Sequence, residues 1–520
     1  MTFSLDEIYQ MIYSFHEDFA LWILIFAVIF GFILSFAVGA NDSANSWGTP
    51  VGAGTVSFGV AVICGAIMET AGAILLSSGV VKTIAGDSSV VDISLYRSNQ
   101  TVEWDNFQNG EPYMEGEKSL MLGMLSSMVA SQVWQLVATY LSWPVSGTHA
   151  IISSLMGFTL VEKGLHGINP GSANLFCASG VYKVIYGLFL SSFIALFVGL
   201  VVYYFVYKFA ITSKNPKGWK NRICYTICVF FMFTAVGFTL ATAKNIKAPH
   251  LIDGEGCLNP NKTLFGFLVG IGCGVLVAIP FYFFILDRLM NSTKEFRLSL
   301  GKVQKPSSKE ALVMHKIDSD NNVTTVEVDY EAETVHEAQE IKNVFRPLQF
   351  IVACFAALNH GGNDVGNCIG PLVTIWYIYK KPLGDFDGED SLVWMAWGGI
   401  GISLGLFMFG KRVIMTMGTK ITPMTPSLGF VVVLSASLVV MFCSLLGIPT
   451  STTHCQVMAV VGGGIARGVI DTNSLNGGLS TVDLKVFRNI GLSWICTIPC
   501  SMAISAALYA ILRVSLIGPL

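Results

Sequence analysis

Residues 39–46 read G-A-N-D-S-A-N-S, and residues 361–368 read G-G-N-D-V-G-N-C. A second pair follows in the same order, with W-P-V-S-G-T-H at residues 143–149 and I-P-T-S-T-T-H at residues 448–454. The chain is therefore an internal duplication, and both motifs lie within strongly apolar sequence. An ionised carboxylate at the centre of a bilayer costs roughly 2.5–3.5 kcal/mol on insertion scales, so such residues mark functional sites. Duplicated halves that meet around them are typical of secondary transporters.

The composition is that of an integral membrane protein. Hydrophobic residues make up 53% of the 520 residues and charged residues only 12%, whereas an ordinary soluble protein carries roughly 25% charged residues. The net charge of −3 gives no indication of a nucleic-acid partner. No basic n-region or small-residue cleavage site precedes the first apolar segment, so we predict no secretory signal peptide. The 12 cysteines include no C-x-x-C pair and predict no metal cluster.

The apolar pattern predicts an all-α polytopic membrane protein with about 12 transmembrane segments. Some of them are expected to be broken or re-entrant, because irregular backbone is tolerated where it lines a protein-enclosed site. The segments lie near residues 19–38, 58–80, 119–140, 149–161, 181–207, 223–242, 263–286, 347–378, 392–410, 428–447, 454–470 and 488–515.

We divide the chain into four regions. Residues 1–207 form a first transmembrane repeat and residues 208–286 form connecting transmembrane segments. Residues 287–345 are rich in Lys, Glu, Asp and Ser and predict a cytoplasmic polar loop that is mostly disordered. Residues 346–520 form the second transmembrane repeat.

The distribution of Lys and Arg predicts the orientation. Residues 1–18 contain neither, whereas basic residues gather in three connections, residues 208–222, 288–302 and 411–420. These connections belong in the cytoplasm, and an even number of crossings then leaves both termini extracellular. The helix that leads to Asp42 runs inward and the helix that leads to Asp364 runs outward, so the two repeats are predicted to be inverted.

The predicted outside loops carry two further features. The sequon Asn99-Gln100-Thr101 is a candidate glycosylation site. Cys177 and Cys257 are the cysteines that we place outside, and this predicts a disulfide between them.

The Asn-Asp motifs predict a cation site. Each copy reads N-D-x-x-N, and hard cations such as sodium prefer carboxylate, amide and backbone oxygens. The glycines around each copy, with Pro50 and Pro371, predict helix breaks that would expose backbone carbonyls. Glu69 lies 27 residues after Asp42 in the next apolar segment and is a further candidate ligand. The candidate cation-binding residues are Asn41, Asp42, Asn45, Glu69, Asn363, Asp364 and Asn367.

The Pro-x-Ser-x-Thr motifs predict an anion site. Proline suits the first turn of a helix, and a helix start presents free N–H groups and the positive end of the helix dipole. Ordinary helix capping by the same hydroxyls is the alternative. His149 and His454 occupy matching places, as structural residues or as proton carriers. The candidate anion-binding residues are Ser146, Gly147, Thr148, Ser451, Thr452 and Thr453.

These motifs resemble those of the inorganic phosphate transporter (PiT) family, the sodium–phosphate symporters of animals and their relatives. The resemblance covers nearly the whole chain outside residues 287–345. It includes V-W-Q-L at residues 133–136, G-K-R-V-I-M-T-M-G at residues 410–418 and T-P-M-T-P-S at residues 422–427. It implies a phosphate site between inverted repeats, sodium ions beside it as co-substrate, a homodimer and a plasma-membrane location. By the same likeness Asn41, Asp42, Asn363 and Asp364 are cation-site residues, and Ser146, Thr148, Ser451, Thr452 and Thr453 are phosphate-site residues.

The chain departs from the family pattern at one position. The family usually has a glutamate 18 residues before the serine of the second motif, and this chain has Val433 there. The leading hypothesis is electrogenic sodium-coupled import of inorganic phosphate. The alternative is a phosphate sensor or surface receptor on a transporter scaffold, with transport weakened by Val433. Proton coupling and sulfate transport stay open as variants. Because no nucleophile–base constellation lies in a water-accessible segment, we expect neither an enzyme nor a cofactor.

Overall fold

The structure of the chain is a computed structural model. It describes residues 5–85, 90–96, 112–174, 179–242, 260–293, 296, 298, 313–317, 323–327, 337–380, 391–419, 422, 424–445, 448–472 and 481–518.

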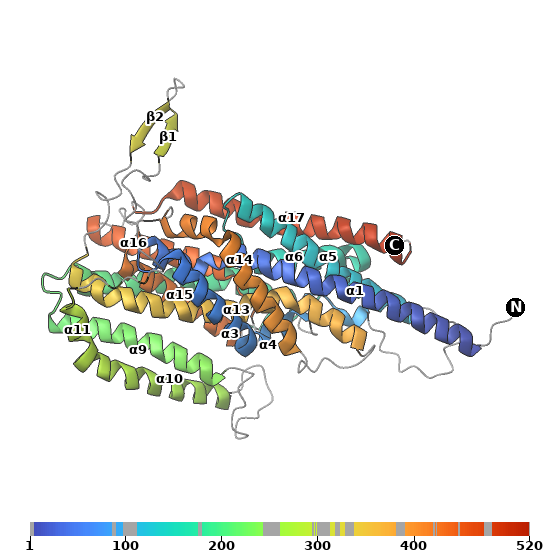
Figure 1. The fold of residues 1–520 in the computed structure, drawn as a ribbon, viewed down its shortest axis with the longest axis horizontal. Helices are drawn as coiled ribbons and strands as arrows, with labels where there is room; N and C mark the ends of the chain where they lie inside the picture. Colours follow the sequence, from blue (N-terminus) through green and yellow to red (C-terminus); the bar gives the residue numbers. More distant parts are fainter. Residues whose placement is uncertain are drawn as a thin grey trace.

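Helices make up most of the described structure (Figure 1). The α-helices are α1 (Leu5–Asp42), α2 (Ala44–Gly52), α3 (Phe58–Leu76), α4 (Ser78–Ala85), α5 (Pro112–Tyr140), α6 (Gly147–Lys163), α7 (Gly180–Ile185), α8 (Ser191–Val206), α9 (Trp219–Thr242), α10 (Pro260–Pro280), α11 (Leu286–Met290), α13 (Gln339–Lys380), α14 (Leu392–Thr419), α15 (Pro426–Leu445), α16 (Thr452–Thr472) and α17 (Leu484–Leu516). The shorter helical turns are η1 (Ile93–Leu95), η3 (Gly164–Gly167), η4 (Tyr186–Leu190), η5 (Tyr207–Ile211) and η7 (Phe281–Ile285), and the strands are β1 (Val313–Ile317) and β2 (Val323–Glu327).

The predicted fold class is confirmed. Among the described residues, 10 helices are long and apolar enough to cross a membrane. Helices α6 and α16 correspond to two further segments of the predicted set, and both begin inside the bundle rather than at its edge. They are the second arms of two helical hairpins, which are the re-entrant elements that the apolar pattern predicts.

The first hairpin consists of α5 and α6, and its outer ends lie together. Arg513, near the end of α17, forms ion pairs with Glu115 at the start of α5 and with Glu162 at the end of α6. The chain therefore enters and leaves this hairpin at one end of the molecule. Helix α1 starts and α17 finishes at that same end (Figure 1).

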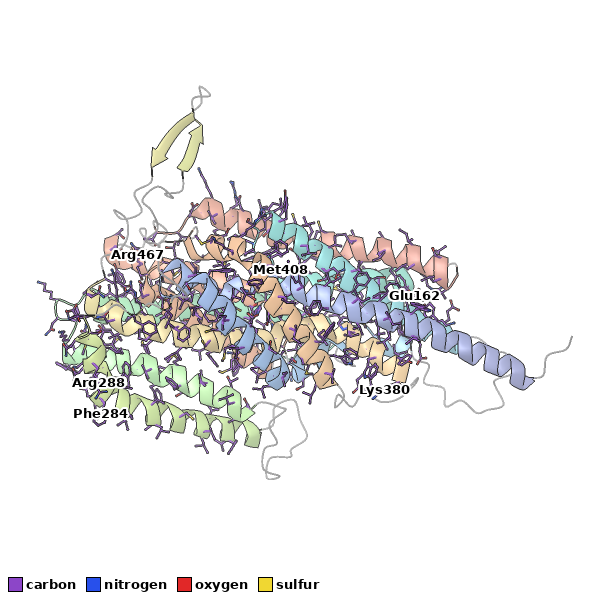
Figure 2. All side chains as sticks on the ribbon, in the orientation of Figure 1. Glu162, Phe284, Arg288, Lys380, Met408 and Arg467 are labelled. Atoms are coloured by element: carbon purple, nitrogen blue, oxygen red, sulfur yellow. The ribbon has the colours of Figure 1, made fainter. Side chains whose placement is uncertain are left out.

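The second hairpin consists of α15 and α16, and it opens at the opposite end. Ser427, at the start of α15, donates a hydrogen bond to Glu337, which precedes α13. Figure 2 shows Arg467 of α16 at the same end as Arg288, with Glu162 and Lys380 at the other end. Helices α1 and α13 also run in opposite directions (Figure 1). An inverted repeat requires this arrangement, and the repeat itself stays a prediction.

Close packing between α3 and α13 depends on two glycines. A Cβ atom on Gly72 would lie 1.9 Å from the carbonyl oxygen of Leu358. A Cβ atom on Gly361 would lie 2.0 Å from the carbonyl oxygen of Glu69. Any larger side chain would force the two backbones apart, and small residues at such contacts are typical of membrane helices.

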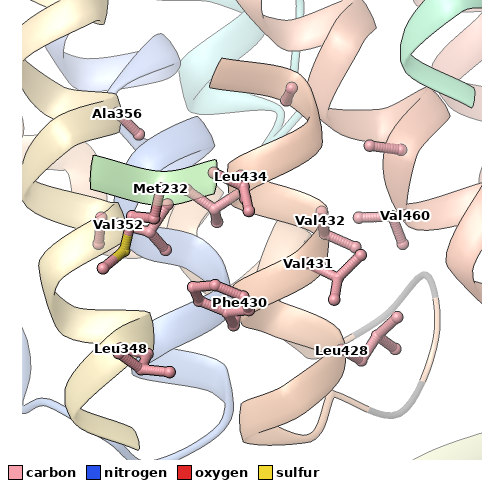
Figure 3. Close-up of a cluster of buried hydrophobic side chains, with 14 of the residues drawn as sticks. Met232, Leu348, Val352, Ala356, Leu428, Phe430, Val431, Val432, Leu434 and Val460 are labelled. Carbon is pink, nitrogen blue, oxygen red and sulfur yellow. The ribbon is translucent and has the colours of Figure 1, made fainter. Parts of the chain in front are cut away.

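A large apolar cluster surrounds α15 (Figure 3). The side chains of Phe430 and Leu434 lie near Met232 of α9 and Val352 of α13. Val433, the position at which the chain departs from the family pattern, is fully buried in the same cluster. Helices α9 and α10, in the region between the two predicted repeats, pack on each other along one side of the bundle (Figure 1).

The region predicted as a polar loop contains regular structure where it is described. Strands β1 and β2 pair antiparallel, with Met314 opposite Val326. Helix α13 begins at Gln339, so residues 339–345 of the predicted loop are helical. The glycosylation candidate Asn99 and the candidate disulfide partners Cys177 and Cys257 lie outside the described residues.

Candidate functional site

The two N-D-x-x-N motifs lie on buried helices. Asn41 and Asp42 end α1, and Asn45 follows in the first turn of α2. The second copy lies in the middle of α13. The three polar residues of each copy fall within one helical turn, so their side chains leave from neighbouring positions. Asp42 and Asp364 are each only 1% exposed.

The predicted helix breaks are wrong for the second copy. Helix α13 runs without interruption from Gln339 to Lys380 and contains Pro371 in its interior. In the first copy the interruption is a single residue, Ser43, between α1 and α2. The glycines of the second motif serve helix packing instead, as at Gly361. The true breaks lie in the hairpins, between α5 and α6 and between α15 and α16.

The hairpin breaks place two helix starts inside the bundle. The Ser146 hydroxyl accepts a hydrogen bond from the backbone N–H of His149 at 3.2 Å, and this caps α6. The Ser451 hydroxyl accepts one from the backbone N–H of His454 at 3.2 Å, at the start of α16. Helix capping, the alternative role for these hydroxyls, is therefore present in both copies.

Each aspartate contacts a helix start. Asp42 Oδ2 accepts a hydrogen bond from the backbone N–H of Gly147 at 3.0 Å, and its Oδ1 accepts one from Thr453 Oγ1 at 3.4 Å. Asp364 Oδ2 accepts a hydrogen bond from Thr452 Oγ1 at 2.9 Å. Gly147 and Thr452 are the first residues of α6 and α16, so the two copies use equivalent positions.

The third residue of each N-D-x-x-N motif donates a hydrogen bond to a threonine hydroxyl from the other half of the chain. Asn45 Nδ2 donates to Thr453 Oγ1 at 2.9 Å, and Asn367 Nδ2 donates to Thr148 Oγ1 at 2.8 Å. Thr148 Oγ1 in turn donates to the carbonyl oxygen of Thr450 at 3.1 Å. Thr148 and Thr453 hold equivalent positions in the two hairpins. The predicted cation and anion residues therefore form one continuous cluster.

The first residue of each motif holds the nearby hairpin loop. Asn41 Nδ2 donates to the carbonyl oxygen of Trp143 at 2.9 Å, and its Oδ1 accepts from the backbone N–H of Val145 at 3.1 Å. Asn363 Nδ2 donates to the carbonyl oxygen of Thr450 at 2.8 Å. Each asparagine thus donates one hydrogen bond to the backbone of a hairpin loop, and this bond fixes the helix break against the helix that carries an aspartate.

His360 belongs to the site although sequence reasoning missed it. Its Nε2 lies 2.8 Å from Asp364 Oδ2, and its Nδ1 lies 3.2 Å from Glu69 Oε1. Glu69 is fully buried and its Oε2 accepts from Ser43 Oγ at 3.0 Å. Asp42, His360 and Asp364 each offer a ligand atom within 4.8 Å of the others. His360 precedes Asp364 by one helical turn, and this spacing in the sequence could have indicated that His360 belongs to the site.

The two motif histidines stack on each other. The ring centroids of His149 and His454 are 4.3 Å apart, and those of His454 and Trp494 of α17 are 3.7 Å apart. His454 Nδ1 lies 2.5 Å from Ser451 Oγ. The indole of Trp494 donates to the carbonyl oxygen of Pro144 at 3.3 Å. These contacts join the two hairpins and fit the structural role proposed for the histidines.

Three amide oxygens beside the aspartates are suited to hold a cation. They are buried and have no hydrogen-bond partner among the described residues: Asn45 Oδ1, Asn363 Oδ1 and Asn367 Oδ1. A buried acceptor without a partner costs about 1–3 kcal/mol, which a bound cation would recover. Side-chain amide and carboxylate oxygens together form a typical ligand set for a hard cation.

Comparisons with known proteins show the family of the chain. A model of the phosphate transporter family matches residues 38–505. The chain belongs to this family. The inorganic phosphate transporter 2-1, chloroplastic, of Arabidopsis thaliana is 30% identical over 476 residues, which cover 91% of this chain and 69% of the relative. The sodium-dependent phosphate transporter 1-A of Danio rerio is 28% identical, and the match covers 94% of this chain and 95% of the relative.

A solved structure supports the same assignment. The chain resembles a structure described as the sodium-dependent phosphate transporter, with a TM-score of 0.69 and 29% sequence identity. The match covers 95% of this chain and 100% of the other. The family resemblance inferred from the motifs is confirmed. The protein is thus an integral membrane phosphate transporter by family rather than a member of an enzyme family.

Proposed function

We propose that the protein imports inorganic phosphate by electrogenic symport with sodium ions. One observation carries the proposal: the carboxylates of Asp42 and Asp364, one from each half of the chain, meet at the starts of α6 and α16 in the buried centre of the bundle. A cation-type and an anion-type group therefore share one site. Sodium and phosphate bound in such a site would lie close enough to stabilise each other.

Sodium binding would resolve an electrostatic conflict within the site. The carboxylates of Asp42 and Asp364 are buried and have oxygen atoms within 4.8 Å of each other. Each carboxylate therefore raises the energy of the other's charged form. A sodium ion beside each would offset the repulsion and would use the free amide oxygens of Asn45, Asn363 and Asn367. The same ions would lower the repulsion between the aspartates and an incoming phosphate. This coupling explains why phosphate binding would depend on sodium.

Phosphate binding would use the two helix starts. A helix N-terminus directs backbone N–H groups and a positive dipole end at an anion. The site joins two such ends, and Thr148, Thr452 and Thr453 add hydroxyl groups without adding charge. Two opposed helix starts with threonine hydroxyls between them form a suitable surface for a small tetrahedral anion.

The membrane potential favours import of two sodium ions with each monovalent phosphate. Moving one negative charge into a cell that is negative inside costs about 2.3 kcal/mol per 100 mV. Two sodium ions with one monovalent phosphate carry a net positive charge and reverse the sign of that cost. We propose a plasma-membrane location from the family resemblance and the sequon at Asn99. We propose that both termini are extracellular, because the basic connections predict this orientation.

Uptake of labelled phosphate tests the proposed function. We expect cells that express the protein to accumulate phosphate in sodium medium, and uptake to fall to the level of non-expressing cells when choline replaces sodium. Addition of phosphate in sodium should also produce an inward current under voltage clamp. Uptake without current would contradict the proposed stoichiometry of two sodium ions and one monovalent anion. Sodium-independent uptake would contradict symport itself.

Val433→Glu is expected to change the coupling to sodium. Val433 is fully buried on α15, the first arm of the hairpin whose second arm, α16, begins directly after Ser451. A carboxylate there would add a buried negative charge, and a cation would stabilise it. We expect a lower sodium concentration for half-maximal uptake or a larger number of ions moved for each phosphate.

The neighbouring variant Val432→Glu is the control for Val433→Glu. Val432 is equally buried, and its side chain faces Gly463 of α16. Val432→Glu therefore introduces the same negative charge on a different face of α15. Sodium activation curves are compared at matched surface expression. A curve for Val433→Glu that coincides with that of the wild type, or a change shared by both variants, would argue against a specific role for position 433.

A further inference from the structure

Gln135 lies beside the site but is not one of the candidate cation-binding or anion-binding residues. It is the glutamine of the V-W-Q-L segment on α5, and its side chain is fully buried. Neither Nε2 nor Oε1 has a hydrogen-bond partner among the described residues. A buried amide that lacks both a donor partner and an acceptor partner is costly, because it lost its hydrogen bonds to water on folding. A polar ligand that enters the site would supply the missing hydrogen bonds.

The amide faces the start of α6. An ideal Cβ atom on Gly147 would lie 2.7 Å from Gln135 Nε2 and 2.9 Å from Asp42 Oδ2. The amide and the carboxylate therefore flank the same point, at the first residue of the helix. The backbone N–H of Gly147 donates to Asp42 Oδ2 at that point. Gln135 thus lies at the junction of the cation-type and anion-type groups.

The surrounding contacts hold this part of α5 in place. Trp134 Nε1 donates to Thr497 Oγ1 of α17 at 2.9 Å. Thr139 Oγ1 donates to the carbonyl oxygen of Gln135 at 2.8 Å and accepts from Asn41 Nδ2 at 3.1 Å. The amide is therefore carried on a backbone that is fixed to both the bundle and the Asn-Asp motif. A ligand would meet a preorganised group, which lowers the entropic cost of binding.

We propose that Gln135 is a direct ligand of the transported anion and that it favours tetrahedral anions that carry a proton. The inference rests on the proposed function and deepens it. The amide N–H donates to one oxygen of the anion, and Asp42 Oδ2 beside it accepts a hydrogen bond from a hydroxyl group of the same anion. Monovalent phosphate and arsenate have both groups.

Sulfate lacks the second group. At neutral pH it is a fully deprotonated dianion, so it has no hydroxyl to donate to the carboxylate. A site that places a donor and an acceptor side by side leaves the acceptor unpaired when sulfate binds, and an unpaired buried acceptor weakens binding strongly. The pair formed by Gln135 and Asp42 therefore selects phosphate against sulfate.

Gln135→Leu tests the proposal. It keeps a similar volume and removes both polar atoms. We expect the KM for phosphate uptake to rise about tenfold to a hundredfold, the effect of losing one hydrogen bond to a charged ligand. The inhibition constant of arsenate should rise by the same factor, and any inhibition by sulfate should weaken as well, because an oxygen of sulfate also accepts the amide N–H. Gln135→Glu, which replaces the donor with an acceptor, should raise the KM for phosphate at least as much.

Gln349→Leu is the matched control. Gln349 is also a fully buried glutamine, on α13, and its Oε1 accepts from Thr55 Oγ1 at 2.5 Å. It precedes Asn363 by 14 residues, about 20 Å along the helix. We expect its phosphate KM to match that of the wild type. A phosphate KM for Gln135→Leu equal to that of Gln349→Leu would overturn the proposal, and so would a changed sodium activation with unchanged anion affinity.

A second measurement separates this proposal from the proposed function. The rise in melting temperature caused by phosphate in sodium is measured on purified protein, without transport. If the wild type shows no uptake, symport is wrong, but a phosphate-induced rise that Gln135→Leu loses and Gln349→Leu keeps would still support the ligand role. If the wild type transports and the rise is equal in both variants, symport stands and the ligand role is wrong.

Discussion

Asp42→Asn and Asp364→Asn are each expected to abolish sodium-dependent phosphate uptake. Asparagine keeps the size of the side chain and one acceptor oxygen, so the hydrogen bond from Gly147 to position 42 or from Thr452 to position 364 can persist. The variant loses the negative charge that would hold sodium. An interaction with a charged group is worth about 1.5–3 kcal/mol, and the upper value corresponds to roughly a hundredfold loss of uptake.

The control for these variants is Asp287→Asn. Asp287, in the first turn of α11, is half exposed and forms an ion pair with Arg222 of α9. Exposed ion pairs contribute little to stability, so uptake should stay near that of the wild type. All variants are compared at equal surface expression. Normal sodium activation in both Asp42→Asn and Asp364→Asn would mean that the two carboxylates do not bind the coupling ion.

The organisation of the site could be predicted from the sequence because the motif is repeated. One N-D-x-x-N segment is weak evidence, but two copies followed by two Pro-x-Ser-x-Thr segments predict a shared site. The structure brings the two kinds of segment together, through Asp42 with Gly147 and Asp364 with Thr452. Glu69 was identified because a carboxylate within an apolar segment needs a reason to be there.

The position of the helix breaks could not be predicted in the same way. Glycine and proline either interrupt a helix or allow another backbone to approach closely, and the choice depends on the neighbouring helix. At Gly361 the neighbour is the backbone of Glu69, which a Cβ atom would overlap. Helix α13 therefore remains continuous through a segment that has the composition of a break. Pairwise packing of this kind is not encoded in the local pattern.

His360 shows a second limit. Its partners are Asp364, one turn away, and Glu69 on α3. The nearer spacing was visible in the sequence, but the role of the residue depends on the approach of α3, which two glycines permit. A histidine in an apolar helix has many structural explanations, and only the second carboxylate makes this one specific.

His360→Leu is expected to lower the stability of the protein by about 3–5 kcal/mol and to abolish uptake. The imidazole lies between the carboxylates of Glu69 and Asp364, both buried. Removing the group that balances them leaves buried negative charge without compensation, and this is the usual cost of breaking one partner of a buried ion pair. Thermal unfolding of the purified protein in detergent, followed by intrinsic fluorescence, measures the change.

The double variant His360→Leu/Glu69→Gln identifies the cause. Glutamine keeps an oxygen that can accept the hydrogen bond from Ser43 and removes one of the two charges. If electrostatic imbalance causes the loss, the double variant should be more stable than His360→Leu alone, because replacing both members of a buried pair is far less costly than replacing one. Uptake should stay absent, since the site would still lack His360. A double variant that is as unstable as the sum of its single changes would show that packing around the imidazole, rather than charge, holds α3 against α13.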